Sequence, residues 1–263
     1  MPRVIAMVLI LIGLTAIAQA DGPQPLKVLW CTGGGSHDYK HLTPLLTKSI
    51  QKYARVEFDV SWDYKSWARK GFADKYDAMV QFHTVHDKDL KVGKSIADNI
   101  AATIRAGKPT LVIHGTLHSF RELGQDREAY CEAIGLTSSA HDGAKELTTK
   151  KVADHPITRF WPDDWKTPKD ELYQNIKLWP SATPLLTAYS ESSHRDHAVA
   201  WINRYGKGQV FATSLGHGTP TTDMESYHRL LANGLLWVCG QLDSSGKPKP
   251  AYAGPEAEAA FRH

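Results

Sequence analysis

Histidines follow several strand-like segments of this 263-residue chain, at the point where each segment ends. His37 comes after the first apolar run and its glycine turn, His83 ends a second run, His114 and His118 follow a third, and His217 follows a fourth. Imidazole exchanges protons near neutral pH and also binds metals. Because ligands bind outside the carboxyl ends of the strands of an open parallel sheet, we expect these side chains to line one site.

Carboxylates accompany these histidines and could accept protons or orient the imidazole rings. Asp38 adjoins His37, Glu171 lies in an Asp-Glu-Leu-Tyr run, and Asp223 follows His217. The predicted catalytic residues are His37, Asp38, His118, Glu171 and His217, with His118 and His217 as the acid–base pair. Structural alternatives stay open, because a strand-end histidine can simply bond a loop carbonyl and Asp38 can simply cap the next helix.

The turn Gly33-Gly34-Gly35-Ser36 could bring backbone N–H groups close to a small ligand at the start of a helix. It matches neither the dinucleotide-binding fingerprint nor the P-loop, so we do not expect a nucleotide site. The predicted substrate-binding residues are Gly34, Gly35, His83, His114 and Tyr173.

A divalent metal is left open as a cofactor. His118 and His217 could supply two of three ligands, with Glu171 or Asp38 as the third. The chain has no H-E-x-x-H motif and no closely spaced ligand pair of the zinc type. A metal site would therefore depend on side chains converging from distant segments.

Covalent acyl transfer is disfavoured. The stretch 114–120 lies where a strand turns into a helix, the position of a nucleophile elbow, yet it holds no cysteine and no G-x-S-x-G. The chain has three cysteines, Cys31, Cys131 and Cys239, with no C-x-x-C pair, and they can form at most one disulfide. Cys31 and Cys239 are expected in the core. A cysteine hydrolase of the amidotransferase type would need Cys31 or Cys131 at the pocket.

Strand-like and helix-like patterns alternate through the first half of the chain. The expected strands are 26–32, 56–62, 78–82 and 109–113, and the expected helices are 42–53, 92–104 and 127–134. This order predicts a parallel sheet with helices on both faces. Expected strands of the second half are 146–152, 172–176, 184–189, 198–203 and 209–214, the last two forming a hairpin, followed by a helix at 227–238.

The first twenty residues are basic at Arg3, apolar from Val4 to Ala18, and end in Ala18-Gln19-Ala20, the layout of a secretory signal peptide. We expect a periplasmic or secreted protein with no membrane association once 1–20 are removed, one domain at 21–243, and a mobile tail at 244–263. The net charge of +3, or +2 without Arg3, is too balanced for a dedicated nucleic-acid binder. The oligomeric state is not predicted.

The order of the motifs resembles the ThuA-like (trehalose utilisation) family. The matching segments are 28–30 with 34–38, then 115–120, 155–158, 170–173 and 198–218, in order over nearly the whole mature chain. The resemblance implies an α/β fold, a flavodoxin-like (glutamine amidotransferase-like) sandwich with a mainly parallel central sheet, helices on both faces and no catalytic cysteine.

The resemblance also implies a role in carbohydrate catabolism, where the family is associated with disaccharides oxidised at the sugar 3-position. His37, Asp38, His118, Glu171 and His217 match its shared motifs by position. The first hypothesis is therefore a sugar isomerase, lyase or hydrolase that acts on a 3-keto-glycoside or related small sugar by proton transfer. The alternative is a non-catalytic carbohydrate-binding protein that would use Trp161 and Trp165 in an exposed loop.

Overall fold

The computed structural model describes residues 23–259, so the predicted signal peptide lies outside the described residues. The strands are β1 (Leu26–Gly34), β2 (Val56–Ser61), β3 (Ala78–Thr84), β4 (Thr110–Ile113), β5 (Leu136–His141), β6 (Lys145–Lys151), β7 (Lys166–Asp170), β8 (Tyr173–Leu178), β9 (Ala182–Ser190), β10 (Arg195–Tyr205) and β11 (Gly208–Thr213). Nine of them form one sheet in the order β2-β1-β3-β4-β11-β10-β9-β6-β7, and β5 pairs with β8 separately.

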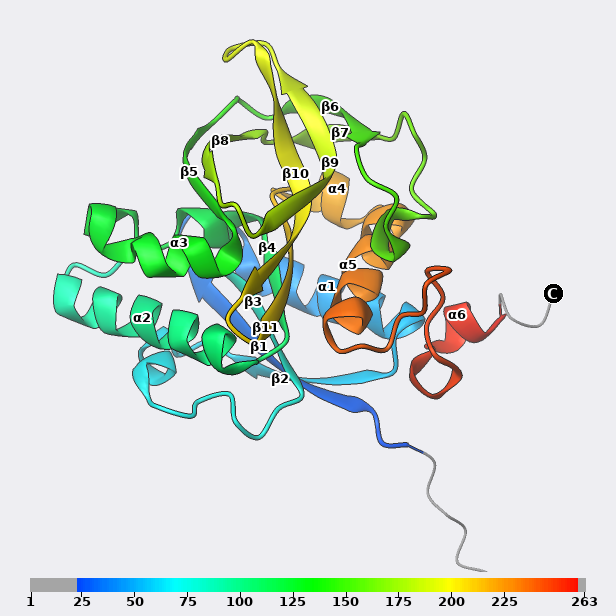
Figure 1. Ribbon diagram of the computed structural model, residues 1–263, viewed down its shortest axis with the longest axis horizontal. Helices are drawn as coiled ribbons and strands as arrows, with labels where there is room; N and C mark the ends of the chain where they lie inside the picture. Colours follow the sequence, from blue (N-terminus) through cyan, green and yellow to red (C-terminus); the bar gives the residue numbers. More distant parts are fainter. Residues whose placement is uncertain (1–22, 260–263) are drawn as a thin grey trace, which may run out of the picture.

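The first five strands of that sheet run parallel, in the order of a flavodoxin-like fold. The other four are antiparallel and extend the sheet away from the parallel core, toward the top of Figure 1. The predicted α/β fold with a mainly parallel centre is therefore confirmed. The parallel arrangement also brings the carboxyl ends of β1, β3, β4 and β11 to the same edge.

Helices cover both faces of the parallel strands (Figure 1). They are α1 (Tyr39–Tyr53), α2 (Leu90–Ala106), α3 (Glu128–Ile134), α4 (Thr219–Thr222), α5 (Glu225–Val238) and α6 (Pro255–Ala259), with 3₁₀ turns at Tyr64–Ala68, His114–His118, Arg121–Arg127, Pro156–Thr158 and Pro250–Tyr252. One apolar core lies between the sheet and α1 with α5. A second lies between the sheet and α2 with α3.

Helix α2 shows how the sequence sets these elements. Ile96, Ile100 and Ile104 form one buried stripe that faces the sheet. The Asp89 side chain caps the start by accepting hydrogen bonds from two backbone N–H groups. Gly107, with φ of +120°, ends the helix as predicted, because glycine adopts this conformation without strain.

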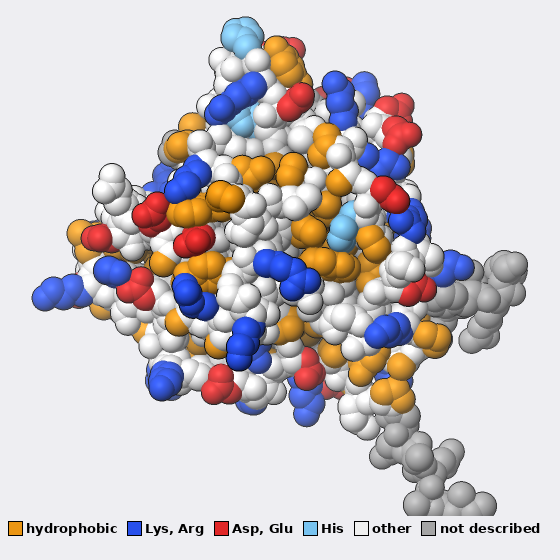
Figure 2. Space-filling view, in the orientation of Figure 1, with side chains coloured by type: hydrophobic (Ala, Val, Ile, Leu, Met, Phe, Trp, Pro, Cys, Tyr) orange, Lys and Arg blue, Asp and Glu red, His pale blue; other side chains and the backbone are white. Residues whose placement is uncertain are grey.

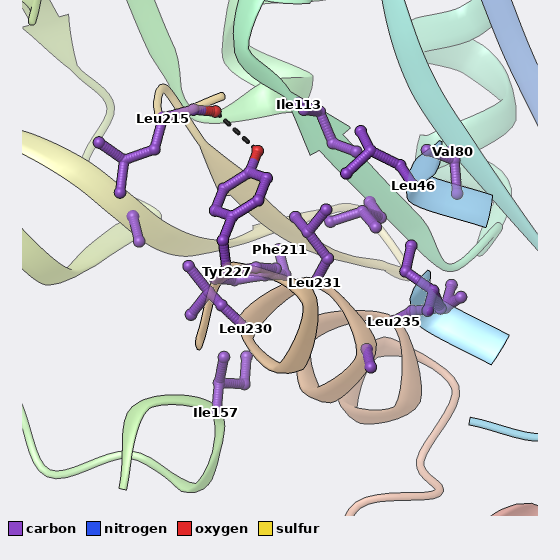
Figure 3. Close-up of a cluster of buried hydrophobic side chains, with 14 of the residues drawn as sticks. Leu46, Val80, Ile113, Ile157, Phe211, Leu215, Tyr227, Leu230, Leu231 and Leu235 are labelled. Carbon is purple, nitrogen blue, oxygen red and sulfur yellow. Dashed lines mark hydrogen bonds between the residues drawn. The ribbon is translucent and has the colours of Figure 1, made fainter. Parts of the chain in front are cut away.

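Helix α5 connects one core to the carboxyl edge of the sheet (Figure 3). Leu231 and Leu235 are fully buried in this core together with Phe211 of β11, and burying such a side chain contributes about 1.5–3 kcal/mol. The Tyr227 hydroxyl donates to the carbonyl oxygen of Leu215 at 2.8 Å. This bond fixes the segment that follows β11.

The structure contains each predicted strand and helix, with bounds that differ by a few residues at most. Strands β5 and β7 were not predicted. Only Thr167 and Asp170 are buried in β7, so this polar strand carries no apolar alternation that a sequence pattern could reveal.

The predicted mobile tail differs from the structure over residues 244–259. Leu242 pairs with Pro248, and Ala253 pairs with Ala54 at the end of α1. The Gly254 N–H donates to the carbonyl oxygen of Tyr53 at 3.0 Å. Backbone pairing holds this segment in place, although its composition shows no periodicity.

No helix within residues 23–259 is long and apolar enough to cross a membrane. On the face seen in Figure 2, basic and acidic side chains are interspersed.

Candidate active site

Three histidines meet at the carboxyl edge of the parallel strands. His37 follows β1, His114 follows β4 and His217 follows β11. The ring centroids are 4.8 Å apart for His37 and His114, 5.2 Å for His37 and His217, and 5.4 Å for His114 and His217. Each ring contributes one nitrogen, and these three nitrogens all lie within 4.8 Å of one another. Within residues 23–259, this is the group of side chains that could share a metal ion.

Glu171 lies beside these rings, between β7 and β8. Its Oε2 is 3.1 Å from His217 Nδ1 and 3.5 Å from His114 Nε2, and its Oε1 is 3.5 Å from His141 Nδ1. The glutamate is mostly buried, with 13% of its side chain exposed, whereas 34% of the His217 side chain is exposed. His37, His114, His217 and Glu171 are called the histidine–glutamate cluster below.

His114 occupies a strained turn. Its φ of +41° is left-handed, an uncommon conformation for a residue with a side chain and one often found at functional sites. Nδ1–H donates to the carbonyl oxygen of Ser214 at 2.6 Å, so Nε2 is the ring nitrogen left to face the cluster. The Tyr173 hydroxyl lies 3.3 Å from that Nε2. The ring is thus held in one orientation, with Nε2 toward Glu171.

The residue after His114 has to be glycine. A Cβ at Gly115 would lie 2.4 Å from Thr84 Oγ1, 2.7 Å from the Tyr39 hydroxyl and 2.8 Å from the His37 ring. The absence of a side chain lets the loops after β1, β3 and β4 approach closely enough to form the cluster.

Asp170 fixes the backbone around the cluster, a role that no sequence motif indicates. Its buried carboxylate accepts hydrogen bonds from the N–H groups of Gly216 (2.8 Å), His217 (3.1 Å) and Glu171 (2.8 Å). His141, which contacts Glu171, was also missed. The available signal was position: Asp170 directly precedes Glu171 in the Asp-Glu-Leu-Tyr run.

The charges in the cluster differ between its members. Burial, together with the neighbouring His114 and His217, lowers the pKa of His37 to about 3, so that ring is neutral. Contact with Glu171 raises the pKa of His217 above its ordinary value. Burial would raise the pKa of Glu171, but its contacts with His114 and His217 outweigh burial and hold that pKa well below the usual range. Glu171 is therefore a carboxylate.

His118 is not part of the cluster, which corrects the predicted acid–base pair and the predicted metal ligands. Its ring stacks on Tyr173, with centroids 4.1 Å apart and planes within 8°, and its Nε2 is 3.3 Å from Ser138 Oγ. The other contacts of the Tyr173 ring are with His114 and His141, so Tyr173 lies between His118 and His114. Burial and the nearby Arg121 lower the pKa of His118 to about 3.

The two aspartates singled out in the sequence serve helix ends. Asp38 caps α1 by accepting from the His41 N–H at 3.2 Å, and its side chain is exposed. Asp38 therefore has the helix-capping role that was the alternative to catalysis. Its side chain is not the third metal ligand that the sequence led us to expect. Asp223 is exposed at the end of α4.

The glycine turn holds the end of β1 against β3. A Cβ at Gly34, whose φ is +95°, would lie 2.0 Å from the carbonyl oxygen of Thr84, and the Gly35 N–H donates to that oxygen at 3.1 Å. Gly34 and Gly35 are both exposed. The turn therefore directs His37 into the cluster while its outer side stays accessible, and substrate binding there remains a prediction.

Comparison with known proteins identifies the family. The family model ThuA, described as trehalose utilisation, matches residues 27–238. This chain belongs to the ThuA family. Membership supports a carbohydrate-related role. A comparison with curated proteins gives no significant match.

Solved structures share the fold of this ThuA-family chain. A ThuA-like protein from Parabacteroides merdae is 16% identical, with a TM-score of 0.67 over 89% of this chain and 99% of its own. One from Bacteroides uniformis is 14% identical, with a TM-score of 0.67 over 85% and 95%. A protein from Thermoplasma acidophilum, described as part of a GMP synthase, is 13% identical, with a TM-score of 0.55 over 83% and 96%. At these identities the similarity shows the glutamine amidotransferase-like fold alone.

The cysteines of this ThuA-family chain do not reach the site. All three are free thiols. Cys31 and Cys131 are buried in the core against α2 and α3, and burial raises the pKa of both thiols. Because a thiolate is the nucleophilic form, the cysteine-hydrolase alternative has no usable residue.

The tryptophans expected in an exposed loop are buried. Trp161 and Trp165 are 1% and 6% exposed, with ring centroids 4.3 Å apart. Their Nε1 atoms donate to Thr149 Oγ1 at 2.9 Å and Ser226 Oγ at 2.7 Å. The prediction of an exposed sugar-stacking loop is wrong, since these rings pack and bond within the protein.

His83 also lies away from the cluster, which corrects its prediction as a substrate-binding residue. The ring is fully buried against Trp67 and Phe120. Its Nε2 is 2.7 Å from Gln81 Oε1 and its Nδ1 is 2.9 Å from Ser119 Oγ. Burial lowers the pKa of His83 to about 3, so the folded protein holds a neutral ring.

We expect His83 to make folding stability depend on pH. The unfolded chain takes up a proton at His83 below pH of about 6.5, whereas the folded chain does so only near pH 3. Stability is thus lost as the pH falls between these values, by about 2 kcal/mol from pH 7 to pH 5. Urea unfolding at both pH values checks this. The His83→Gln variant should lose about 2 kcal/mol less over this interval than the wild type, and equal losses would contradict the prediction.

Proposed function

We propose that this ThuA-family chain is an enzyme that acts on a 3-keto-glycoside or a closely related sugar by proton transfer. One observation carries the proposal: an ionised, mostly buried glutamate lies within 3.5 Å of two imidazoles, with a third imidazole adjoining them, at the ligand-binding edge of the sheet. The exposed part of the His217 ring opens the cluster to solvent.

The chemistry of a keto-sugar suits this arrangement. A C–H bond next to a carbonyl group is acidified, because the electron pair left behind moves into the carbonyl oxygen as an enolate. Glu171 would take that proton, and the imidazoles beside it would stabilise the enolate oxygen. When the enolate re-forms the carbonyl, the electron pair can expel a glycosidic oxygen on the next carbon or accept a proton on the other face. Elimination and isomerisation therefore share the same first step.

His114 would act as a positioning residue in this scheme. Its side chain is fully buried, so it does not reach the sugar, but its Nε2 lies 3.5 Å from Glu171 Oε2. His217 and His37 are partly exposed and would contact the sugar. The signal-peptide-like residues 1–20 support a place in the periplasm or outside the cell, where the substrate would be an imported or external glycoside.

A sugar panel tests the proposal. Parent glycosides and their 3-keto forms are screened by thermal shift, because a bound ligand raises the melting temperature by mass action. The keto forms should raise it, and mass spectrometry should show their conversion. Saturable binding without conversion of any compound would contradict an enzyme and favour a carbohydrate-binding protein, although the burial of Trp161 and Trp165 removes the aromatic surface expected of one.

A further inference from the structure

We propose that His37, His114 and His217 bind one divalent transition-metal ion of the Zn²⁺ class, with Glu171 next to it. The juxtaposition of three imidazole nitrogens from three separate strand ends is the basis of this inference. It concerns binding, so it stands or falls independently of the proposed sugar chemistry.

The spacing of the nitrogens suits a single ion. They lie within 4.8 Å of one another, and a tetrahedral ion with bonds of about 2.1 Å holds its ligands about 3.4 Å apart. Closing this difference needs only small side-chain rotations. His37 follows the glycine turn after β1, and His217 lies between Gly216 and Gly218, so both loops can adjust.

One ring nitrogen of the group has neither a hydrogen bond nor an ion pair. Nδ1 of His37 is buried and has no such partner, whereas Nδ1 of His217 lies 3.1 Å from Glu171 Oε2. An unpaired buried polar atom costs free energy, and such atoms in a native structure call for an explanation. A metal bond would give Nδ1 of His37 a partner.

His114 has the surroundings of a metal ligand. Metal-binding histidines usually donate the other ring N–H to a carbonyl or carboxylate, which fixes the tautomer. His114 donates Nδ1–H to Ser214 at 2.6 Å and directs Nε2 toward the cluster. The Tyr173 contact with Nε2, at 3.3 Å, is long enough to be released. The Asp170 carboxylate in turn holds the backbone of His217 by accepting a hydrogen bond from the His217 N–H.

The net charge of the four side chains also suits a divalent ion. Metal binding would release any proton from the imidazoles, and three neutral rings with one carboxylate would leave a divalent ion with a net charge of +1. Three protein nitrogens leave at least one position open, as in catalytic zinc sites. A bound ion would act as a Lewis acid toward a sugar oxygen, and Glu171 would remain the nearby proton acceptor.

Metal titration of the purified full chain tests the inference. After dialysis against a chelator, Zn²⁺ should bind with a stoichiometry of one per chain by isothermal titration calorimetry. Mg²⁺, which prefers oxygen ligands, should bind far more weakly. The His37→Ala and His217→Ala variants should each bind Zn²⁺ at least about 100-fold more weakly, since losing a ligand costs more affinity than losing a group that only orients one.

Two further measurements keep the test decisive. The control His86→Ala removes an exposed histidine that pairs with Glu122 at 2.9 Å outside the cluster, and it should bind Zn²⁺ like the wild type. Should the ligand variants not fold, Co²⁺ added to the wild type should give the visible absorption of a nitrogen-ligated four- or five-coordinate site. Absence of binding, unchanged affinity in folded ligand variants, or a thiolate–cobalt band would overturn the inference. Sugar turnover that persists after complete metal removal would overturn the Lewis-acid part and leave the proposed function standing.

Discussion

Replacing Glu171 by glutamine is expected to lower kcat/KM for a 3-keto-glycoside by about 10³-fold, equivalent to about 4 kcal/mol of transition-state stabilisation. Glutamine keeps the shape of the side chain but does not accept a proton. The loss should fall mainly on kcat, because the substrate would still contact His37 and His217. Steady-state kinetics of the purified variant, with its melting temperature as a folding check, measure this effect.

Glu122→Gln is the matched control. Glu122 also pairs with a histidine, His86, at 2.9 Å and is partly buried, with 24% of its side chain exposed. Glu122 lies outside the histidine–glutamate cluster, so the kcat/KM of the Glu122→Gln variant should stay within about twofold of the wild type. Similar losses in both variants, or full activity in Glu171→Gln, would show that Glu171 is not the proton acceptor.

Replacing Gly234 by alanine is expected to lower the free energy of unfolding by about 3 kcal/mol. Gly234 lies in the middle of α5, where a Cβ would be 1.9 Å from Phe211 Cδ1 and 2.5 Å from Cε1 (helix and Phe211 in Figure 3). Phe211 is fully buried on β11, and close-packed interiors leave little room for a ring to shift. The helix would have to move away from the strand that leads to His217. Urea unfolding followed by circular dichroism measures the change.

Gly93→Ala in α2 is the control for helix propensity. A Cβ there would meet only Asp87 Cβ at 3.7 Å and Leu123 Cδ2 at 3.9 Å, which are ordinary contacts. Alanine should therefore stabilise the protein by up to about 1 kcal/mol, because it favours the helix more than glycine does. The two glycine-to-alanine changes would then shift the free energy of unfolding in opposite directions. Equal effects would mean that the contact with Phe211 does not limit the packing of α5.

The fold and the convergence of the site could be predicted because both depend on strong local patterns. The apolar strands β1, β3 and β4 and the isoleucine stripe of α2 specify a parallel sheet covered by helices. Once strands run parallel, their carboxyl ends share an edge, so the sequence is enough to expect His37, His114 and His217 near one another.

The roles within the site could not be predicted, because they depend on side-chain direction at single turns. His114 and His118 follow the same strand, and only the left-handed turn at His114 sends one ring into the cluster and leaves the other behind Tyr173. His83 ends β3 on the face that packs against α2, so it enters the core instead. The role of Asp170 could not be predicted, because its carboxylate accepts hydrogen bonds from backbone N–H groups of a segment that begins 46 residues away.

The central claim is that the histidine–glutamate cluster removes a proton from the carbon next to a sugar ketone. Proton NMR in D₂O tests it most directly, by following the C–H signal beside the ketone of a 3-keto-glycoside with the purified enzyme. The wild type should incorporate solvent deuterium at that carbon or in the product derived from it, and Glu171→Gln should not. Conversion of the sugar with no deuterium at that position, or equal incorporation by both proteins, would contradict the claim.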